Sequence, residues 1–564
     1  MLLWLQICVL FAVLSLNAAG ETRTRAGVIG GGVGGLVVAR NLAQAGFETT
    51  LIEAQPSCGG RMSSIHLLDK FRFDTGPSLL LLPEVYKQAL KNASDVEMLA
   101  VNPFYRVYFE NEEASHVDLE AEEGGIEQTL LRQIDPEGTL KNVDSAFRRY
   151  KRIADSFLAF GLPAVIQEKF PSWQAFIAFL GASIEAFPLL SHDTMIRDIF
   201  GLEAEEGEKD SSTWTPGKKL RALLSFQDLY VGLSPSTTPA VFSLLQALEY
   251  SQGIYYPRGG FVTVANALEK GAREAGVTIM TQQMVKSLVV SQDSREVQAV
   301  VLHDTAVAAE VDVLVSNVDV PFAESSPLLR RCIAATDNEE TTLDYSEGRA
   351  RRAISSCSVV SLHIAFDCEL AAALQHHNLF LSPRIGTSWE NTKDGRAFDA
   401  ARGVNFYVHA PARTDRTACP EGCDAITVLV PVPPISQLGH SSHEEKKLIR
   451  EVTQTVLQRL QACPGMPHDL ASHILATRAV PPSEWQTSYS LHRGSVFGLD
   501  HSLGQLSLLR PRIKHPNLRN YFRVGASTRP GNGVPLVMIG AELTTRAVRA
   551  YDKRRRRTKQ VAEE

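Results

Sequence analysis

The order of apolar and polar residues near the amino end predicts a strand, a helix and a second strand. Residues 26–29 (AGVI) form a short apolar run that is typical of a buried strand. Residues 34–45 carry apolar side chains at helical spacing, and residues 49–53 (TTLIE) return to a strand-like pattern. This order is a βαβ unit, in which the two strands lie parallel in one sheet.

Two later segments show the same kind of pattern. Residues 255–260 (YYPRGG) precede a helical run, and β-rich stretches follow between residues 277 and 317. A third α/β segment begins at residue 521, and blocks of mixed pattern separate the three. We therefore expect an α/β fold in which a discontinuous cofactor domain is interleaved with an α+β substrate domain. The expected cofactor domain comprises residues 26–130, 256–320 and 505–550, and the expected substrate domain comprises residues 131–255 and 321–504.

The two ends of the chain differ in character from the rest. Residues 1–20 are uncharged and mostly apolar, and they end in Ala-Ala-Gly, which predicts a secretory signal peptide or, if uncleaved, an N-terminal anchor. Residues 551–564 include a run of Lys and Arg and are predicted to form a basic polar tail. Attraction of this run to anionic lipid is the functional alternative.

Composition and charge narrow the possible functions. The formal net charge is -6, so nothing in the charge balance favours nucleic acid as a partner. The 8 cysteines are scattered, which argues against a complete disulfide framework. Cys419 and Cys423 could bridge or bind a metal ion, but no second Cys/His pair at ligand spacing supports this. We therefore favour an ordinary loop there and expect no metal site.

The segment between the first strand and helix carries the most specific chemical signal. Gly30, Gly32 and Gly35 satisfy the G-x-G-x-x-G pattern of dinucleotide-binding turns, in which glycine lets the backbone approach a pyrophosphate. The helix that follows offers free N–H groups and a positive dipole end to the phosphates. Glu53 ends the second strand and can accept hydrogen bonds from a ribose. This pattern is shared by NAD and FAD proteins.

The residues after Glu53 favour FAD. Gly59-Gly60-Arg61 follows the acid after five residues, and this spacing resembles the FAD-dependent amine oxidase superfamily. Longer stretches are similar to its phytoene desaturase branch, and most strongly to fungal and bacterial carotenoid desaturases. These stretches are FRFDTGPSLLLLP (71–83), SFQDLYVGLSPSTTPAVFSLLQALEYSQGIYYPRGGF (225–261), FYVHAPARTDRTACPEGCDAITVLVPV (406–432), LHRGSVFGLDH (491–501) and VGASTRPGNGVPLVMIGA (524–541). The similarity extends from about residue 26 to residue 548.

The resemblance implies a Rossmann-type domain of the glutathione-reductase/amine-oxidase kind that binds FAD without a covalent bond. It implies that the glycine turn and Arg61 contact the pyrophosphate, Glu53 the ribose, and the backbone of Val285 the adenine. It also implies that Gly525, Ala526, Gly533 and Val534 lie beside the ribityl chain and the isoalloxazine. The full set of implied cofactor residues is Gly30, Gly31, Gly32, Gly34, Gly35, Glu53, Gly60, Arg61, Val285, Gly525, Ala526, Gly533 and Val534.

The activity that the resemblance implies is desaturation of a carotenoid precursor such as phytoene. Hydride removal from a CH2–CH2 unit between double bonds leaves a delocalised cation, so a strongly tuned base is not required. Asp228 and Arg258 are the candidate catalytic residues, and each has a structural alternative, a turn cap or an ion pair. Arg529 and Ser236 depart from the family pattern, which puts the substrate range in doubt. A carotenoid isomerase, a retinoid saturase, a flavin amine oxidase and a non-catalytic polyene-binding flavoprotein are the alternatives.

A polyene substrate is almost insoluble in water, which favours peripheral contact with a membrane. Residues 173–180 (WQAFIAFL), continued by apolar residues to Leu190, form a candidate membrane face, with a buried helix as the alternative. The leader then favours entry into the secretory pathway and an endoplasmic-reticulum membrane location, with the plastid as the alternative. The implied terminal electron acceptor is oxygen or a quinone.

Overall fold

The computed structural model describes most of the chain. The described residues are 23–91, 96–112, 116–120, 133–168, 172–202, 212–303, 308–334, 342–344, 346, 353–436, 441–506 and 509–563. The expected leader at residues 1–20 lies outside them. Within these ranges, no helix has both the length and the apolar character needed to cross a membrane.

A parallel sheet of five strands forms the first unit, in the order β21-β13-β1-β2-β9. Its strands are β1 (Arg25–Ile29), β2 (Glu48–Ile52), β9 (Thr278–Met280), β13 (Val313–Ser316) and β21 (Tyr521–Arg523). The helix α2 (Val33–Gln44) joins β1 to β2, as the sequence predicted. Segments far apart in the chain thus share one sheet, which confirms the α/β fold of the cofactor unit.

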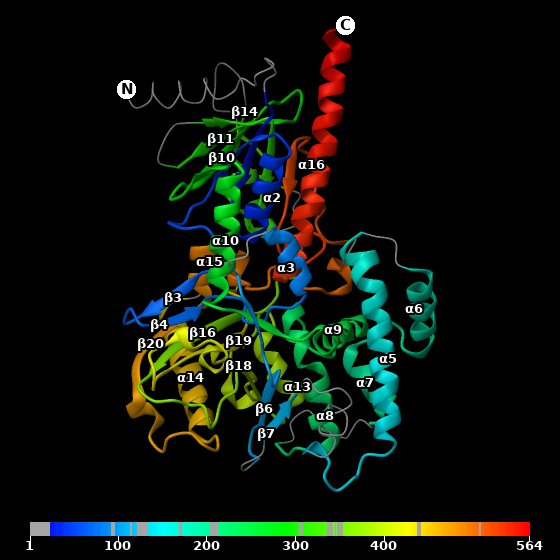
Figure 1. Ribbon diagram of the computed structural model, residues 1–564, viewed down its shortest axis with the longest axis vertical. Helices are drawn as coiled ribbons and strands as arrows, with labels where there is room; N and C mark the ends of the chain where they lie inside the picture. The colour runs from blue at the N-terminus through cyan, green and yellow to red at the C-terminus, as the bar shows by residue number, and fades with distance from the viewer. Residues whose placement is uncertain are drawn as a thin grey trace.

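The two faces of this sheet are covered differently because side chains alternate along each strand. Val28 and Val313 face a core that contains α2, α10 (Phe261–Glu274) and α16 (Val534–Glu563). Ile29 and Leu314 face the opposite side and pack on a smaller sheet. Figure 1 shows α2, α10 and α16 beside one another, with β10 and β11 in the adjoining layer. The smaller sheet has the order β12-β11-β10-β14-β15 and consists of β10 (Val285–Val290), β11 (Val297–Leu302), β12 (Ala308–Glu310), β14 (Cys332–Ala334) and β15 (Thr342–Leu343).

A sheet of seven strands forms the second unit, in the order β20-β16-β19-β18-β17-β6-β7. Its strands are β6 (Tyr105–Phe109), β7 (His116–Leu119), β16 (Ser358–Phe366), β17 (His377–Leu381), β18 (Phe406–His409), β19 (Asp424–Val432) and β20 (Ile474–Val480). The helix α14 (Ser442–Gln461) covers one face through buried valine and leucine side chains. Strand pairing therefore places β6 and β7 with the substrate unit, although the sequence assigned residues 26–130 to the cofactor domain.

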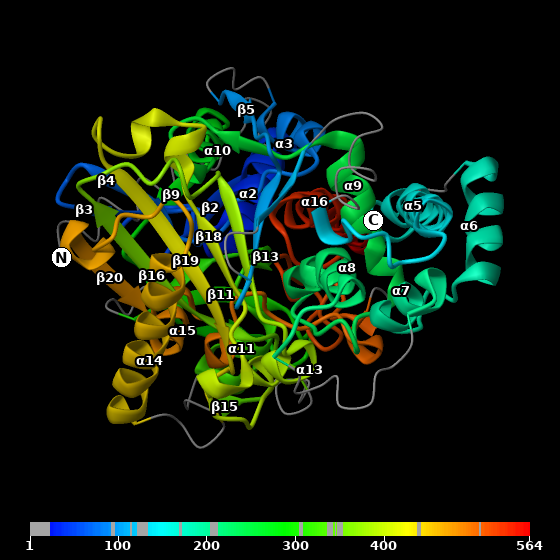
Figure 2. The same ribbon diagram turned by 90° about the horizontal axis from the view of Figure 1, so that it is seen from below.

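Helices flank this second sheet (Figure 2). They are α5 (Val143–Gly161), α6 (Trp173–Glu185), α7 (His192–Phe200), α8 (Pro216–Ser225), the 3-10 helix η2 (Phe226–Val231) and α9 (Leu244–Gln252). The remaining larger elements are α3 (Pro83–Leu90), α11 (Val320–Ser325), α12 (Pro327–Arg330), α13 (Ile385–Ser388), α15 (Pro482–Tyr489), β3 (Ser64–Leu67), β4 (Phe71–Asp74), β5 (Met98–Ala100) and β8 (Tyr255–Pro257). β5 and β8 pair antiparallel, which ties residues 98–100 to the strand that precedes α10.

The carboxyl end of the described chain differs from the predicted polar tail. α16 continues through the basic run as a helix to Glu563, and it projects from the molecule in Figure 1. Asp552 accepts a hydrogen bond from the hydroxyl of Thr24 at 2.8 Å and pairs with Arg556 one helical turn later at 2.9 Å. Arg555 pairs with Asp312 at 2.8 Å. These contacts hold the first turns of the basic run against the start of β1.

Candidate functional site

The turn between β1 and α2 leaves no room for side chains. Gly30 has φ +93°, a backbone conformation that other residues rarely adopt. A Cβ atom added to Gly35 would lie 1.9 Å from the carbonyl oxygen of Gly30, so the helix starts in direct contact with the end of the strand. No side chain caps α2 at Gly32, and its first N–H groups are therefore open to an anion. This geometry suits a pyrophosphate.

Glu53 follows β2 and lies beside this turn. One carboxylate oxygen accepts a hydrogen bond from the N–H of Gly31 at 2.5 Å, and the other accepts one from the N–H of Gln55 at 2.7 Å. Burial raises the pKa of the Glu53 carboxyl, and these backbone hydrogen bonds oppose the rise. A carboxylate has about four lone-pair sites, so Glu53 keeps acceptor capacity for ribose hydroxyls.

The second glycine segment packs directly on the first. The N–H of Gly59 donates to the carbonyl of Gly31 at 2.9 Å, and a Cβ atom on Gly60 would lie 3.3 Å from the Cα of Gly32. Arg61 is half-buried, and its guanidinium donates to the carbonyl of Val496. The structure thus brings the predicted pyrophosphate residues together.

Val285 begins β10 close to Glu53. The N–H of Gln283 donates to the carbonyl of Glu53 at 2.9 Å, and the N–H of Gln282 donates to that of Gln55 at 3.0 Å. These bonds join the loop before β10 to the carboxyl end of β2. Val285 therefore lies on the same side of the turn as the predicted ribose site.

The carboxyl-terminal glycine segment meets the first turn through Asn317, which sequence analysis did not identify. Asn317 follows β13, and its side-chain amide donates to the carbonyl of Gly30 at 3.4 Å. Its side-chain oxygen would lie 2.7 Å from a Cβ atom on Gly34 and 3.3 Å from one on Gly525. Asn317 therefore occupies the space between the two segments. In the sequence, the position of Asn317 directly after an apolar strand is the one feature that could have identified it. That feature is not sufficient, because no local pattern predicts that β13 lies beside β1.

The rest of that segment forms a bend that ends at α16. Ala526 is buried, and its carbonyl accepts a hydrogen bond from the guanidinium of Arg510 at 2.9 Å. Gly533 has φ +94° and immediately precedes Val534, the first residue of α16. A Cβ atom on Gly533 would meet nothing within 4 Å. The bend thus presents an open backbone surface at a helix amino end, which suits contact with a flat ring.

The two candidate catalytic residues occupy quite different environments. Asp228 is fully buried, and its carboxylate lies 2.9 Å from Nδ1 of His192, 36 residues away in sequence. Burial raises the pKa of Asp228, and the charge and hydrogen bond of His192 oppose this. Arg258 lies at the surface and pairs with Glu97 at 2.6 Å. The ion pair of Arg258 is the structural role that the sequence offered as its alternative. Asp228 also has structural contacts, but it pairs with a histidine instead of capping a turn.

The cysteines of the described chain are all free. Cys419 donates from its thiol to the carbonyl of Cys423 at 3.3 Å, so the two belong to one loop. Asp367, Cys368 and His473 lie close enough to share an ion, but Asp367 and His473 already form a surface pair at 2.8 Å. The described residues therefore offer no buried metal cluster to the cofactor turn.

Comparisons with known proteins agree with this geometry. Residues 33–537 match the family model described as flavin containing amine oxidoreductase. The chain is 30% identical over 551 residues to a phytoene desaturase of Fusarium fujikuroi, with 92% of this chain and 88% of that protein covered. It is 30% identical over 530 residues to a zeta-carotene-forming phytoene desaturase of Myxococcus xanthus, with 92% of each covered. The solved structure of cyclohexylamine oxidase from Brevibacterium oxydans has the same fold, with a TM-score of 0.57, 12% identity, and 93% of this chain and 98% of that chain covered.

Proposed function

Because the chain belongs to the family of flavin-containing amine oxidoreductases, we propose that it is an FAD-dependent desaturase acting on a carotenoid precursor such as phytoene. The observation that carries this proposal is the 30% identity to phytoene desaturases across 92% of the chain. A match over 92% of the chain extends across both units of the fold. The reaction would remove two hydrogens from a CH2–CH2 unit and extend the conjugated system.

The residues of the turn suit the parts of FAD. The open helix end at Gly32 suits the pyrophosphate, the acceptor at Glu53 suits the ribose, and the bend at Gly533 suits the ring. Bound FAD supplies a hydride acceptor, which the described side chains lack. The task of the chain is then to hold FAD and to align an apolar polyene with it.

The resemblance to amine oxidases is a matter of fold. Their structures share only 12% identity with this chain, and residues 523–550 contain no Phe, Trp or Tyr that could bracket an amine beside the flavin. Desaturation is therefore favoured over amine oxidation. A carotenoid isomerase and a retinoid saturase differ from a desaturase in product, so pigment analysis separates the three.

The proposal is tested by producing the chain in bacteria that accumulate phytoene and by analysing the extracted pigments. A desaturase yields polyenes with more conjugated double bonds and with absorption at longer wavelength. A Gly35→Ala variant serves as the matched control, because it disturbs the cofactor turn and leaves the substrate unit unchanged. Unchanged phytoene in cells that contain folded, FAD-bearing protein would contradict the proposal.

We also propose that the enzyme takes its substrate from a membrane through α6. The apolar side chains of this helix are exposed, with Trp173 62%, Ile177 54% and Ile184 88% accessible, and Ala182 is its buried residue. This exposure disfavours the alternative of a buried helix. α6 lies on the outside of the helical part in Figure 2. An exposed apolar helix beside basic residues is the pattern of an interfacial membrane contact.

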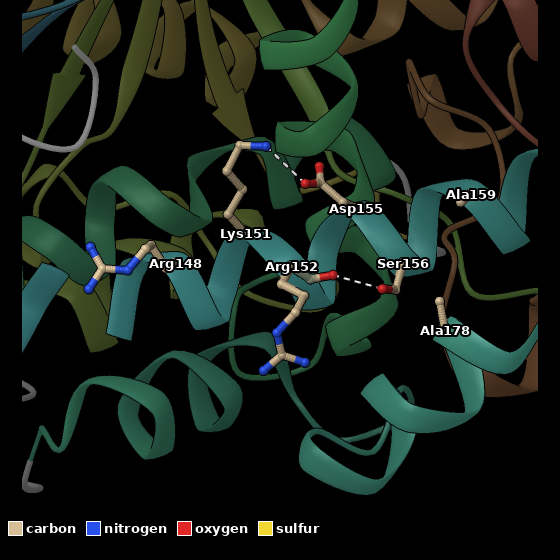
Figure 3. A pocket seen from close by; sticks show the side chains of 7 residues that line it. All are labelled: Arg148, Lys151, Arg152, Asp155, Ser156, Ala159 and Ala178. Carbon is tan, nitrogen blue, oxygen red and sulfur yellow. Dashed lines mark hydrogen bonds and ion pairs between the residues drawn. The ribbon is translucent and has the colours of Figure 1, made fainter. Parts of the chain in front are cut away.

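Basic side chains surround a hollow of about 380 Å³ between α5 and α6 (Figure 3). Lys151 pairs with Asp155 at 2.8 Å, and Arg152 pairs with Glu185 at 2.6 Å. Arg148 is exposed, and its guanidinium points away from Lys151 and Asp155 in Figure 3. The lining residues are Arg148, Lys151, Arg152, Asp155, Ser156, Ala159 and Ala178. The basic residues outnumber the acidic ones, which favours anionic headgroups next to the apolar face.

Two leucines with equal exposure test this membrane contact. Leu180 on α6 and Leu475 on β20 are each 47% accessible, so Leu→Glu adds the same charge at either site. We expect the Leu180→Glu variant of the chain without residues 1–20 to lose flotation with anionic phospholipid vesicles, and the Leu475→Glu variant to keep it. Equal flotation of the two variants would refute the role of α6.

A further inference from the structure

A line of buried polar groups leads from α9 to the carboxyl-terminal glycine segment. Glu249 on α9 is 1% exposed, and one of its carboxylate oxygens accepts a hydrogen bond from the hydroxyl of Tyr105 at 2.7 Å. The hydroxyl of Tyr105 lies 3.1 Å from that of Tyr230. The carbonyl of Tyr230 in turn accepts a hydrogen bond from the side chain of Asn532 at 2.6 Å. Asn532 directly precedes Gly533, so the backbone of Tyr230, whose hydroxyl ends the line, contacts the bend assigned to the flavin ring.

The other oxygen of Glu249 is held from a different direction. It accepts a hydrogen bond from the side-chain amide of Gln227 at 3.1 Å, and Gln227 accepts one from the amide of Gln246 at 3.1 Å. The line continues through Tyr150 and His192 to the buried Asp228. Amide groups donate without readily passing a proton onward, so this arm orients Glu249. The tyrosine arm consists of hydroxyl groups, which can both donate and accept.

Burial governs the charge of Glu249. It raises the pKa of this carboxyl to about 7, and the hydrogen bonds from Tyr105 and Gln227 oppose the rise. Burial and then the charge of Glu249 raise the pKa of the neighbouring hydroxyls of Tyr230 and Tyr250. Of the three groups in the tyrosine arm, Tyr230 is the half-buried one, whereas Tyr105 and Glu249 are enclosed. The greatest accessible surface in this arm therefore belongs to Tyr230.

We propose that Glu249 is the terminal acceptor of the proton that leaves the substrate, and that the proton reaches it through the hydroxyls of Tyr230 and Tyr105. This proposal rests on the proposed desaturation. One substrate carbon gives a hydride, with its electron pair, to oxidised FAD. The neighbouring carbon loses H⁺, and the electron pair of that C–H bond becomes the second bond of the new C=C. Tyr230 accepts this proton as its own proton passes to Tyr105, and the proton of Tyr105 passes to the Glu249 carboxylate.

The test uses three variants of the FAD-loaded enzyme in phytoene-containing vesicles. Glu249→Gln keeps the shape and removes the acceptor, and Tyr230→Phe interrupts the line at its half-buried end. Tyr86→Phe is the control, because it removes a buried hydroxyl outside this network, one that has no hydrogen-bond partner among the described residues. Anaerobic flavin reduction by phytoene is followed as a function of pH in each variant.

We expect the wild-type rate to rise with pH through a midpoint near the pKa of Glu249. In Glu249→Gln and Tyr230→Phe we expect the rate to fall by roughly 100-fold, which is the low end for loss of acid–base catalysis, and to lose this pH dependence. Tyr86→Phe should keep the wild-type pH profile. A spectroscopic measurement without substrate adds independent support. The titrating infrared signal of buried carboxylic acids should persist in Tyr230→Phe and lose one component in Glu249→Gln, while the buried Asp74, whose pKa burial raises to about 6, contributes another component to every variant.

The outcomes separate this proposal from the proposed function. A wild type that reduces its flavin with phytoene, together with an unchanged pH profile in Glu249→Gln, overturns the relay and leaves desaturation standing. A titrating infrared signal that is undiminished in Glu249→Gln overturns the assignment of the acceptor. A wild type whose FAD is never reduced by phytoene overturns both proposals.

Discussion

Gly35→Ala places a single methyl group at the tightest point of the cofactor turn. The added Cβ would lie 1.9 Å from the carbonyl oxygen of Gly30 and 3.1 Å from its carbonyl carbon, whereas real Cβ atoms essentially never approach within 3.0 Å. Both contacts are with backbone, so no side-chain rotation relieves them. The turn must open by roughly 1 Å, and overpacking of this kind costs about 3 kcal/mol. Alanine recovers about 1 kcal/mol through its helix propensity, which leaves a net loss of about 2 kcal/mol.

The assay compares FAD content and thermal unfolding in the wild type, Gly35→Ala and a control. Gly181→Ala is the control, because Gly181 lies in α6 with nothing within 4 Å of an added Cβ, and alanine should stabilise that helix by about 1 kcal/mol. We expect Gly35→Ala to be purified with little FAD and to unfold at lower temperature, and Gly181→Ala to bind FAD normally. Full FAD occupancy in Gly35→Ala would show that the turn between β1 and α2 does not carry the dinucleotide.

Four further predictions follow from other parts of the molecule. Asn317→Ala removes the contact between the two glycine segments and should weaken FAD binding by about 1 kcal/mol, roughly 5-fold by titration; unchanged affinity would contradict that role. Arg258→Ala should leave turnover and the unfolding temperature unchanged, because its pair with Glu97 is exposed; a large loss of kcat would restore Arg258 as a catalytic candidate. The raised pKa of Glu249 means that the folded state holds a proton between pH 4.5 and about 7 that the unfolded state has lost. The stability that this proton gives is complete below pH 4.5 and is lost as pH rises to 7, a loss of about 3 kcal/mol in the free energy of unfolding. Glu249→Gln should lack this decline in denaturant titrations. A decline in Glu249→Gln as large as that of the wild type would refute the assignment. Finally, we propose that the leader is removed in the secretory pathway, so N-terminal sequencing of the native protein should find a start near Glu21; an intact Met1 supports the anchor instead, and a fluorescent fusion in the cytosol refutes both.

The local part of the site could be predicted from sequence, because its residues are near neighbours in the chain. The turn at Gly30 and the acid at Glu53 are joined by one helix, and the spacing alone brings them together. The resemblance added the segment at Gly525 and the start of β10 at Val285. Gly59 packs on Gly31 because only a short loop separates Gly59 from Glu53, which lies beside the turn.

Contacts between distant segments could not be predicted, since no local pattern encodes strand order or helix packing. Asn317 becomes a partner of the turn only when β13 pairs with β1. His192 and Asp228 meet because α7 and η2 pack in the same buried region, 36 residues apart in sequence. The basic run after Tyr551 was expected to be a solvated tail. It continues α16, where Arg555 pairs with Asp312 and Arg556 with Asp552, and its other basic side chains are exposed.

Anaerobic mixing of the FAD-loaded protein with phytoene in phospholipid vesicles is the most direct test of FAD-dependent desaturation. The absorbance of oxidised flavin and that of the polyene are recorded together in a single turnover. We expect oxidised flavin to disappear while one new conjugated double bond forms for each flavin reduced. Flavin that stays oxidised in the presence of phytoene, or that is reduced without any lengthening of the polyene, would contradict it.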